Sequence, residues 1–371
     1  MQGTDAVPET QARGVGQIVA TGIGRVAISI FVPVVAFIVL YAGFIFLKDS
    51  GAPKLVIVLV AIAWGIGGVA TLYVVANWMT EKLPHRWQGR ILPFVFVGPA
   101  VAILAFYLLV PAVLTAWASL FNATGQEFVG ADNYVYAFTN PEMLVAIRNN
   151  VLWLVVGTLF STGLGLLIAV LVERSRLDKV AKTLIFLPMA ISFVGASIIW
   201  RFVYSYQPEG ETQIGLLNAI LGAFGMAPVS WLTGAPLNTI LLVVILVWGQ
   251  TGFAMVIFSA ALKGVPDEVL EAGRIDGATE VQIFRRIIIP TIWPTIVTVA
   301  TTIAILTLKI YDIVTATTGG NFDTQVIATL MWKQAFTFFD AGRGAALAII
   351  LLVAVTPVIW YNLRQFRGRA I

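Results

Sequence analysis

Long apolar runs, separated by short polar segments, dominate the chain. Eight of these runs are about 20 residues long or longer, and none alternates apolar with polar positions as a half-buried β-strand does. About 20 mainly apolar residues in a helix cross the hydrocarbon core of a bilayer. The sequence therefore predicts an all-α polytopic membrane protein with helices at 26–47, 54–77, 91–117, 149–172, 181–204, 237–262, 291–311 and 343–363.

Composition supports this class and narrows the chemistry. Of the 371 residues, 59% are hydrophobic and 11% are charged, whereas soluble domains carry roughly a quarter charged residues. Cysteine is absent and His85 is the one histidine, so no metal site is expected. The chain is basic, with a pI near 9.3, but its lysines and arginines lie at helix ends, and we expect membrane lipid and no nucleic acid as a partner.

Lysine and arginine gather in alternate segments between the predicted spans. Cytoplasmic segments of membrane proteins carry an excess of these residues, which predicts that the N and C termini are both cytoplasmic. The predicted cytoplasmic side holds Arg13, Arg25, Lys82, Arg86, Arg90, Arg174, Arg176, Lys179, Lys182, Lys263, Arg274, Arg285, Arg286, Arg364, Arg367 and Arg369, and the other side holds only Lys48, Lys54, Arg148, Lys333 and Arg343.

Two of the predicted external segments are long. Residues 118–148 are rich in Gly and Asn, and residues 205–236 contain Glu209 and Glu211 with no Lys or Arg. They are interpreted either as docking surfaces for a partner or as plain connecting loops, because loops carry function but also merely join helices.

The segment between the sixth and seventh spans, residues 263–290, mixes charged and apolar positions. Pro266, Asp267 and Glu268 favour a helix start, because proline fits the first turn and acids favour the positive end of the helix dipole. Gly277 permits a positive φ, so a short helix, a break and a second helix are expected. The first helix is amphipathic and suits a groove on a partner, with apolar residues Val269, Leu270, Ala272 and Ile275. By physical pattern alone, an ordinary cytoplasmic hairpin is the favoured interpretation.

The same segment resembles the EAA loop of ABC importer permeases, a pattern of Glu-Ala-Ala, three residues, Gly, nine residues, Ile, any residue and Leu-Pro. Every spacing is kept here, although Gly273 stands in place of Ala and Ile289 in place of Leu. The matching residues are Glu271, Ala272, Gly273, Gly277, Ile287, Ile289 and Pro290.

This resemblance implies a type I ABC importer permease fold, in which the loop forms a coupling helix that enters a cleft on an ATPase subunit. The coupling residues it implies are Glu271, Ala272, Gly273, Asp276, Gly277 and Pro290. The chain has no G-x-x-x-x-G-K-[ST] phosphate loop. We therefore expect ATP and Mg on a separate ABC ATPase dimer, with no cofactor and no enzymatic activity on this chain. One coupling loop against two ATPase clefts predicts a second permease subunit, either a different chain, which is favoured, or a second copy.

Further segments are similar to carbohydrate-importer permeases of the maltose and α-glucoside type: Gly130–Tyr134, Asn149-Asn150, Leu187–Ala190, Trp231-Leu232, Trp248 and Thr318–Gly320. The resemblance implies two domains, residues 1–90 as a tail with two accessory spans and residues 91–371 as a six-helix core that contains the loop 263–290. It also implies the function: alternating-access import of an α-glucoside, oligosaccharide or related polyol. An extracytoplasmic sugar-binding protein would deliver the solute to the cytoplasmic (inner) membrane of a bacterium or archaeon.

The resemblance places substrate on a face formed by Gly249, Gln250, Phe253, Thr302, Leu306 and Lys309. Other interpretations stay open for these residues. Small residues in a span also serve helix packing, Lys309 could pair with Asp312 at i, i+3, and Arg201 and Tyr204 could simply reach the interface, as long polar side chains do.

Two alternatives from other classes remain. A secondary transporter is disfavoured because no inverted repeat is visible and acidic residues within the spans are nearly absent. A structural subunit of a membrane complex that transports nothing is the other.

Overall fold

The structure, a computed structural model, describes residues 15–81, 85–173 and 175–367. Seven helices within these residues are long and apolar enough to cross a membrane, and a bent helix pair makes an eighth span. The predicted all-α architecture with about eight spans is confirmed. In the described chain, the β pairing is a single bridge between Phe121 and Phe128. Residues that the orientation argument uses but that lie outside the described part are Arg13, Lys82, Arg174 and Arg369.

The chain folds as two compact units, residues 1–111 and 112–371. The first holds α1 (Val15–Asp49), α2 (Lys54–Glu81) and most of α3 (His85–Ala118). Trp64 of α2 donates its indole N–H to the carbonyl of Leu40 in α1 at 2.9 Å, and Tyr73 of α2 donates to Phe96 O of α3 at 2.9 Å. The boundary between the two units lies at residue 111, within α3. The domain boundary expected at residue 90 rests on the family resemblance and stays a prediction.

The second unit contains every candidate site residue. Its helices are α4 (Asp132–Thr139), α5 (Pro141–Leu152), α6 (Thr158–Glu173), α7 (Asp178–Phe186), α8 (Phe193–Val203), α9 (Leu216–Ala223), α10 (Leu237–Lys263), α11 (Asp267–Ile275), α12 (Glu280–Ile283), α13 (Ile289–Leu308), α14 (Asp312–Thr317), α15 (Ile327–Trp332) and α16 (Ala341–Arg367). Short π-helical turns at Trp153–Gly157, Phe284–Ile288 and Lys333–Thr337 continue α5 into α6, α12 into α13, and α15 onward.

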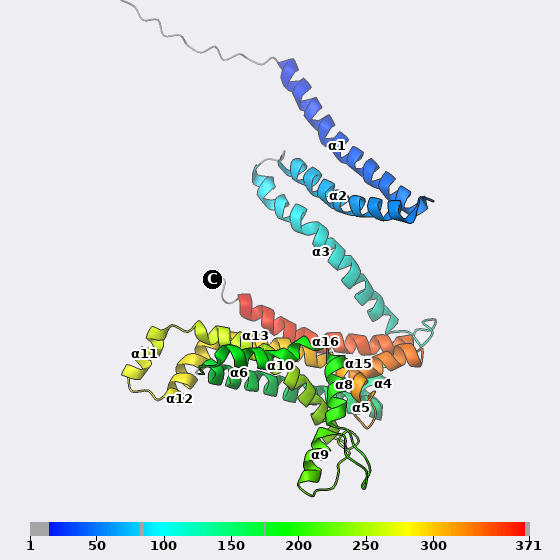
Figure 1. Ribbon diagram of the computed structural model, residues 1–371. Helices are drawn as coiled ribbons and strands as arrows, with labels where there is room; N and C mark the ends of the chain where they lie inside the picture. The colour runs from blue at the N-terminus through cyan, green and yellow to red at the C-terminus, as the bar shows by residue number, and fades with distance from the viewer. Residues whose placement is uncertain (1–14, 82–84, 174, 368–371) are drawn as a thin grey trace, which may run out of the picture. The chain divides into compact units, whose positions relative to one another are not determined.

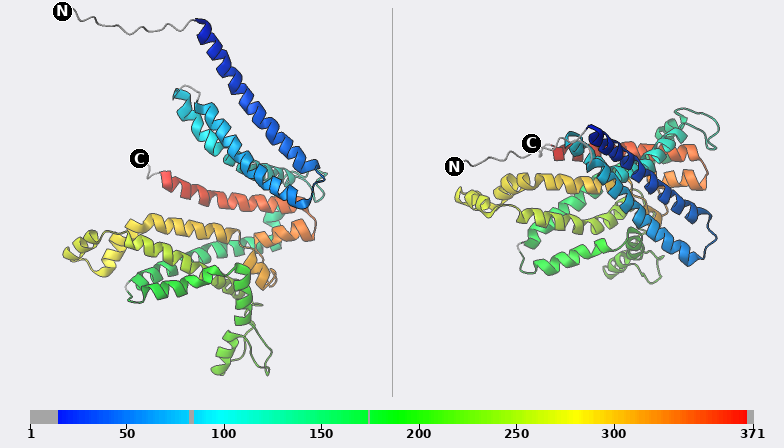
Figure 2. Two further views of the ribbon diagram at one scale, coloured as in Figure 1. Left: turned by 45° about the horizontal axis from the view of Figure 1, so that its top comes forward. Right: turned by 90° about the horizontal axis from the view of Figure 1, so that it is seen from above.

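Helix α10 is the centre of the second unit. It packs against α6, α13, α7 and α8, and Leu242, Ile245, Leu246, Met255 and Phe258 on it are fully buried. Figures 1 and 2 show α6, α10 and α13 side by side, with α11 and α12 at one end of this bundle and α8 and α9 at the other. A core helix apolar on all sides is the pattern expected of a span surrounded by other helices.

Glycine sets the spacing of α6 and α10. A Cβ atom placed on Gly165 would lie 2.4 Å from the Cβ of Ala254 and 3.0 Å from the backbone nitrogen of Met255. Close approach of two helix backbones through small residues is the usual packing device in membranes, where water supplies no driving force between helices.

The fifth span, predicted as one helix over 181–204, is broken. It consists of Asp178–Ala190 and Phe193–Val203, which are bent by 101°. Pro188 lies in a 3-10 turn, Leu187–Ala190, and Ile191 and Ser192 are extended. Ser192 Oγ then accepts a hydrogen bond from Gly195 N at 3.1 Å and so caps α8. A proline followed by an N-capping serine explains the break.

Several boundaries also differ from the sequence prediction, among them the start of α1 at Val15 against the expected 26. Residues 118–148, expected as a loop, contain α4 and the start of α5. The seventh span ends at Leu308, not at 311, and its last carbonyl accepts a hydrogen bond from Asn150 Nδ2 at 3.0 Å. A buried amide that satisfies a terminal carbonyl lets a helix end inside the protein.

Candidate functional site

A cavity of about 410 Å³ lies where α10, α13, α8 and the break in the fifth span meet. Five of the six residues predicted to line a substrate path come together there: Gly249, Gln250 and Phe253 from α10 with Thr302 and Leu306 from α13. The spacing explains this, because residues three and four apart share one face of a helix. The structure thus brings together residues far apart in sequence, while their contact with a substrate stays a prediction.

Gln250 is the polar group of this cavity that has no partner. Its side chain is 7% exposed, and within the described chain it makes no hydrogen bond, although it lines the cavity. In contrast, Thr302 Oγ1 donates to Thr298 O at 2.8 Å within its own helix. An amide offers two donors and an acceptor, and here these groups face the cavity, where a ligand can reach them. The free amide therefore suits a ligand rich in hydroxyl groups.

Aromatic rings accompany the amide. Phe193 and Phe253 line the same cavity, and Trp248, next to Gly249, packs edge to face on Trp200 with ring centroids 5.8 Å apart. A mainly apolar pocket with a few placed polar groups is the common form of small-molecule sites. The residues that line this cavity include no acidic or basic side chain.

Lys309 is the one predicted lining residue that does not line the cavity in the structure. It follows the last residue of α13 and is exposed, one turn beyond Leu306 and outside the cavity lining. Among the ion pairs of the described residues, none joins Lys309 to Asp312, the pairing considered from sequence. Arg201 lies near the carbonyl of Ala316, at 3.5 Å, and Tyr204 donates to Leu241 O at 3.0 Å, so both act between helices.

The break in the fifth span supplies the lining residues that the sequence prediction missed. Pro188, Met189, Ile191 and Ser192 form one wall of the cavity, and Ile245 and Ala196 complete it. The pair of Pro188 and the capping Ser192 within an apolar run was the available signal, since discontinuous helices often surround transport sites.

The loop between α10 and α13 has the helix, break and helix expected from its sequence. Helix α11 begins directly after Pro266 and carries Asp267 and Glu268 in its first turn. Gly277 has φ +80°, and Ala278 N donates to Gly273 O at 3.0 Å, which closes the helix end as a left-handed glycine does. Thr279 and Gln282 then form a capping box that starts α12. Both cavity-lining helices therefore run directly into this loop.

Gly273, one of the two departures from the family pattern, packs closely on the residues that begin the seventh span. It is buried, and a Cβ atom on it would lie 2.9 Å from Ile287 Cδ1 and 3.5 Å from Ile283 Cγ1. Glycine lets α11 lie close to the turn that begins the seventh span. Arg274 Nε is 3.0 Å from Glu280 Oε1, and this hydrogen bond raises the pKa of Arg274 above its usual value. The pair joins α11 to α12.

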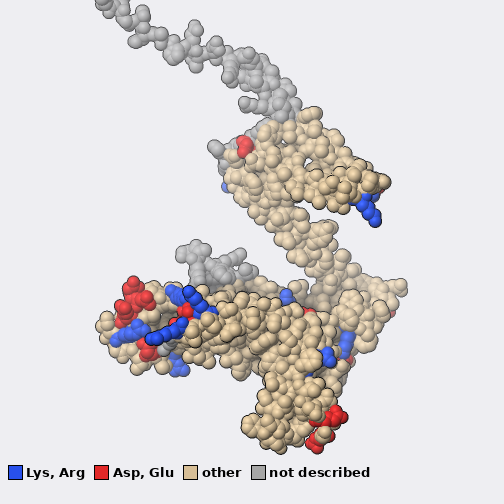
Figure 3. All heavy atoms as spheres, in the orientation of Figure 1, with Lys and Arg blue, Asp and Glu red and all other residues tan. Residues whose placement is uncertain are grey.

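The outer face of α11 has no partner within the described residues of this chain. Glu271, Ala272 and Asp276 are exposed, as is Pro290 at the start of α13, and Ile275 is 85% exposed. Figure 3 shows acidic and basic side chains gathered over α11 and α12 at this end of the molecule. An apolar side chain amid charges on a projecting helix is typical of a surface that docks on another protein.

Comparisons with known proteins agree on the class. The sequence profile described as "Binding-protein-dependent transport system inner membrane component" matches residues 161–367. The osmoprotective compounds uptake permease protein of Synechocystis sp. is 53% identical over 274 residues, which are 74% of this chain and 98% of that protein. The alpha-glucoside transport system permease protein of Rhizobium meliloti is 50% identical over 281 residues, 76% of this chain and 84% of that protein.

A solved structure has the same fold. The crystal structure of a bacterial ABC transporter involved in the import of the acidic polysaccharide alginate contains a chain that superposes with a TM-score of 0.65 at 21% identity. The match covers 77% of this chain and 100% of that one. The profile match over more than half of the sequence decides against the secondary transporter and the structural subunit. The chain belongs to the binding-protein-dependent transport system inner membrane components, and it is a multi-pass permease subunit of an ABC importer.

Proposed function

We propose that this permease translocates a neutral, hydroxyl-rich solute, an α-glucoside, oligosaccharide or glycosylated polyol, through the cavity at Gln250. One observation carries the proposal: the cavity joins an amide that makes no hydrogen bond within the described residues to aromatic rings, and no charged residue lines it. Rings stack on sugar faces and an amide pairs with hydroxyl groups, while the absence of charge disfavours an ionic solute. The two relatives named for α-glucosides and osmoprotective compounds support this class.

The partners follow from the loop. In this proposal α11 docks on an ABC ATPase dimer, which binds ATP and Mg, and this chain holds no cofactor and catalyses no hydrolysis itself. A second permease, a different chain, fills the other ATPase cleft, and an external binding protein delivers the sugar. Both termini and α11 are cytoplasmic, in keeping with the basic residues at that end. The movement of the ATPase pair then changes the access to the cavity from the outside of the membrane to the inside.

The test uses the complete transporter in liposomes, with maltose, trehalose and glucosylglycerol as solutes. Gln250→Ala removes the amide, and the loss of about 1 kcal/mol of hydrogen bonding raises the half-saturating solute concentration about fivefold. Uptake and solute-stimulated ATP hydrolysis are measured together.

Thr251→Ala is the matched control. Thr251 is buried beside Gln250 on α10, but its hydroxyl donates to Val247 O at 2.6 Å and it is not part of the cavity lining. Half-saturation is expected to stay unchanged in this variant. The proposal fails when the wild-type complex takes up none of the three solutes, or when Gln250→Ala and Thr251→Ala behave alike.

A further inference from the structure

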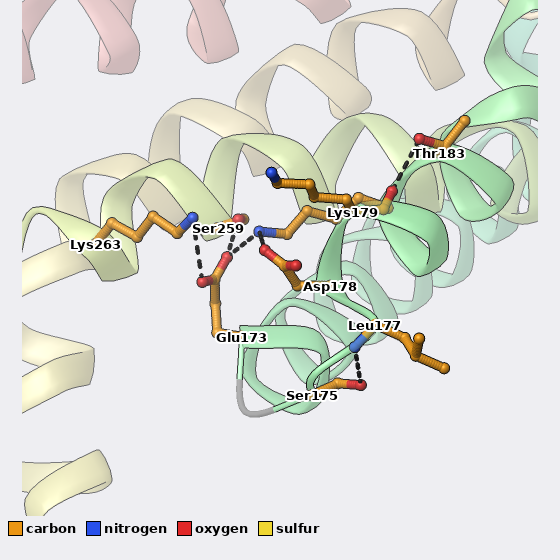
Figure 4. A network of polar contacts seen from close by, with 9 residues as sticks. Glu173, Ser175, Leu177, Asp178, Lys179, Thr183, Ser259 and Lys263 are labelled. Carbon is orange, nitrogen blue, oxygen red and sulfur yellow. Dashed lines mark hydrogen bonds and ion pairs between the residues drawn. The ribbon is translucent and has the colours of Figure 1, made fainter.

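Four charged side chains and a serine form one cluster where α6, α7 and α10 meet (Figure 4). This Glu173 cluster consists of Glu173, Asp178, Lys182, Ser259 and Lys263. The Glu173 carboxylate is its centre: one oxygen accepts hydrogen bonds from Lys182 Nζ and Ser259 Oγ, and the other lies 3.5 Å from Lys263 Nζ. Asp178 lies 3.9 Å from Lys182 Nζ.

The cluster is balanced and partly removed from water. Its two carboxylates face two ammonium groups, and the side chains of Glu173 and Lys182 are each 19% exposed. Charge-assisted hydrogen bonds are stronger than neutral ones, and removal of one partner from a shielded pair leaves an uncompensated charge. The Glu173–Lys182 pair is therefore costly to break at one end, whereas Lys263, whose side chain is 60% exposed, adds a weaker, solvent-screened contact.

The position of the cluster in the chain connects the loop with the cavity. Lys263 is the last residue of α10, and α11 begins after Pro266. Lys182 lies on α7, which continues into the turn whose Pro188 and Met189 line the cavity. We call the end of α10 at Lys263 the stem of the loop. Glu173 thus joins this stem to α7, which leads into one wall of the cavity.

A second contact holds the far end of α7 on α10. A Cβ atom on Gly252 would lie 2.4 Å from Ile185 O and 2.8 Å from Phe186 Cα, so the two backbones touch with no room for a side chain. Helix α7 is therefore fixed to α10 at both ends, by the cluster near its start and by Gly252 near its end. Two fixed points prevent α7 from rotating about a single contact.

We infer that Glu173 is a positioning residue that makes α7, the cavity wall beyond it and the stem of the loop move as one body. Displacement of α11 then reaches the cavity through α7 as well as through α10. This inference rests on the proposed function, because it needs an ATPase that moves the loop. Without the carboxylate, the loop moves while the wall lags, and ATP is hydrolysed without transport.

The experiment measures ATP hydrolysed per solute transported by the complete transporter in liposomes. Glu173→Gln keeps the side-chain shape and removes the charge, and we expect the ratio to rise about fivefold, a typical size for coupling between two sites. Lys182→Gln cuts the same bridge from α7 and is expected to give a similar rise. The double variant is expected to be no worse than either single variant, because both remove one shared interaction.

Lys179→Gln is the matched control. Lys179 lies one turn from Lys182 on α7 and makes no ion pair within the described part of the chain, so its ratio is expected to stay at the wild-type value. If the Glu173→Gln permease does not assemble with the ATPase, the ratio of ATP hydrolysed to solute transported in the Lys182→Gln transporter decides on the inference. A wild-type ratio in Lys182→Gln, or equal ratios in Lys182→Gln and Lys179→Gln, overturns the inference. A wild-type complex without solute-stimulated hydrolysis overturns the proposed function instead.

Discussion

Gly277 shows how one residue shapes the proposed docking loop. Its φ of +80° is in the left-handed region, which costs other residues about 1–2 kcal/mol. We predict that Gly277→Val lowers solute-stimulated ATP hydrolysis of the assembled transporter about 5- to 30-fold, because that energy shifts the loop away from its docking conformation. The measurement is hydrolysis with and without solute at fixed protein concentration.

Gly264 in the same loop provides the comparison. Its φ is −80°, which any residue adopts, and it is exposed. Gly264→Ala is expected to keep wild-type hydrolysis. If both variants hydrolyse ATP at the wild-type rate in response to solute, the conformation of Gly277 has no part in coupling.

Other single residues noted for resemblance to the family have structural partners here. Asn149 Nδ2 donates to Asp323 O at 2.7 Å and to Gln325 O at 2.8 Å, and Asn150 Oδ1 accepts from Ile327 N at 2.8 Å. These buried amides satisfy backbone groups of an irregular segment, as burial requires. Residues of a sequence motif can thus hold two segments together by hydrogen bonds as readily as they can bind a ligand.

At the scale of helices, the spacing of α6 and α10 depends on Gly165. We predict that Gly165→Ala lowers the free energy of unfolding by about 1–3 kcal/mol through overpacking, since its Cβ would lie 2.4 Å from that of Ala254. Thermal unfolding of the purified protein in detergent measures the change as a lower melting temperature.

Gly163, on the same helix, is the control. A Cβ atom there meets nothing within 4 Å, and alanine is about 1 kcal/mol more favourable than glycine in a helix. Gly163→Ala is expected to leave the melting temperature unchanged or slightly higher. An equal drop in both variants would mean that helix contact at Gly165 does not set stability.

For the whole molecule, the arrangement across the membrane is the main prediction. The chain contains no cysteine, so single cysteines report their side without background. Glu211→Cys, in the external segment, is expected to react with an impermeant maleimide on intact cells, and Asp276→Cys, in the loop, only after the cells are opened. The reason is the excess of basic residues on the side of the loop.

Both positions are exposed in the folded chain, so burial does not mask either thiol. The unmodified chain is the control and stays unlabelled. Reaction of Asp276→Cys on intact cells would reverse the topology and remove α11 from contact with a cytoplasmic ATPase.

The sequence by itself determined the number of spans and the form of the loop. Apolar length needs no knowledge of tertiary contacts, because lipid is a uniform apolar solvent, and the turn at Gly277 depends on local backbone freedom. Both appeared in the structure, although the fifth span is broken and several helix ends lie elsewhere than expected. The resemblance also implied that Gly249, Gln250, Phe253, Thr302 and Leu306 form one face, but not which segments close the cavity around them.

Only the tertiary structure decided which of these groups share a cavity and which charges share a cluster. The bend of 101° in the fifth span places Pro188 and Met189 against α10, and helix packing brings Glu173 to Lys263. From sequence, Lys182 and Lys263 indicated orientation alone. Pairing of residues so distant along the chain depends on how helices pack, and packing is set by side-chain shape in three dimensions, which linear spacing does not contain.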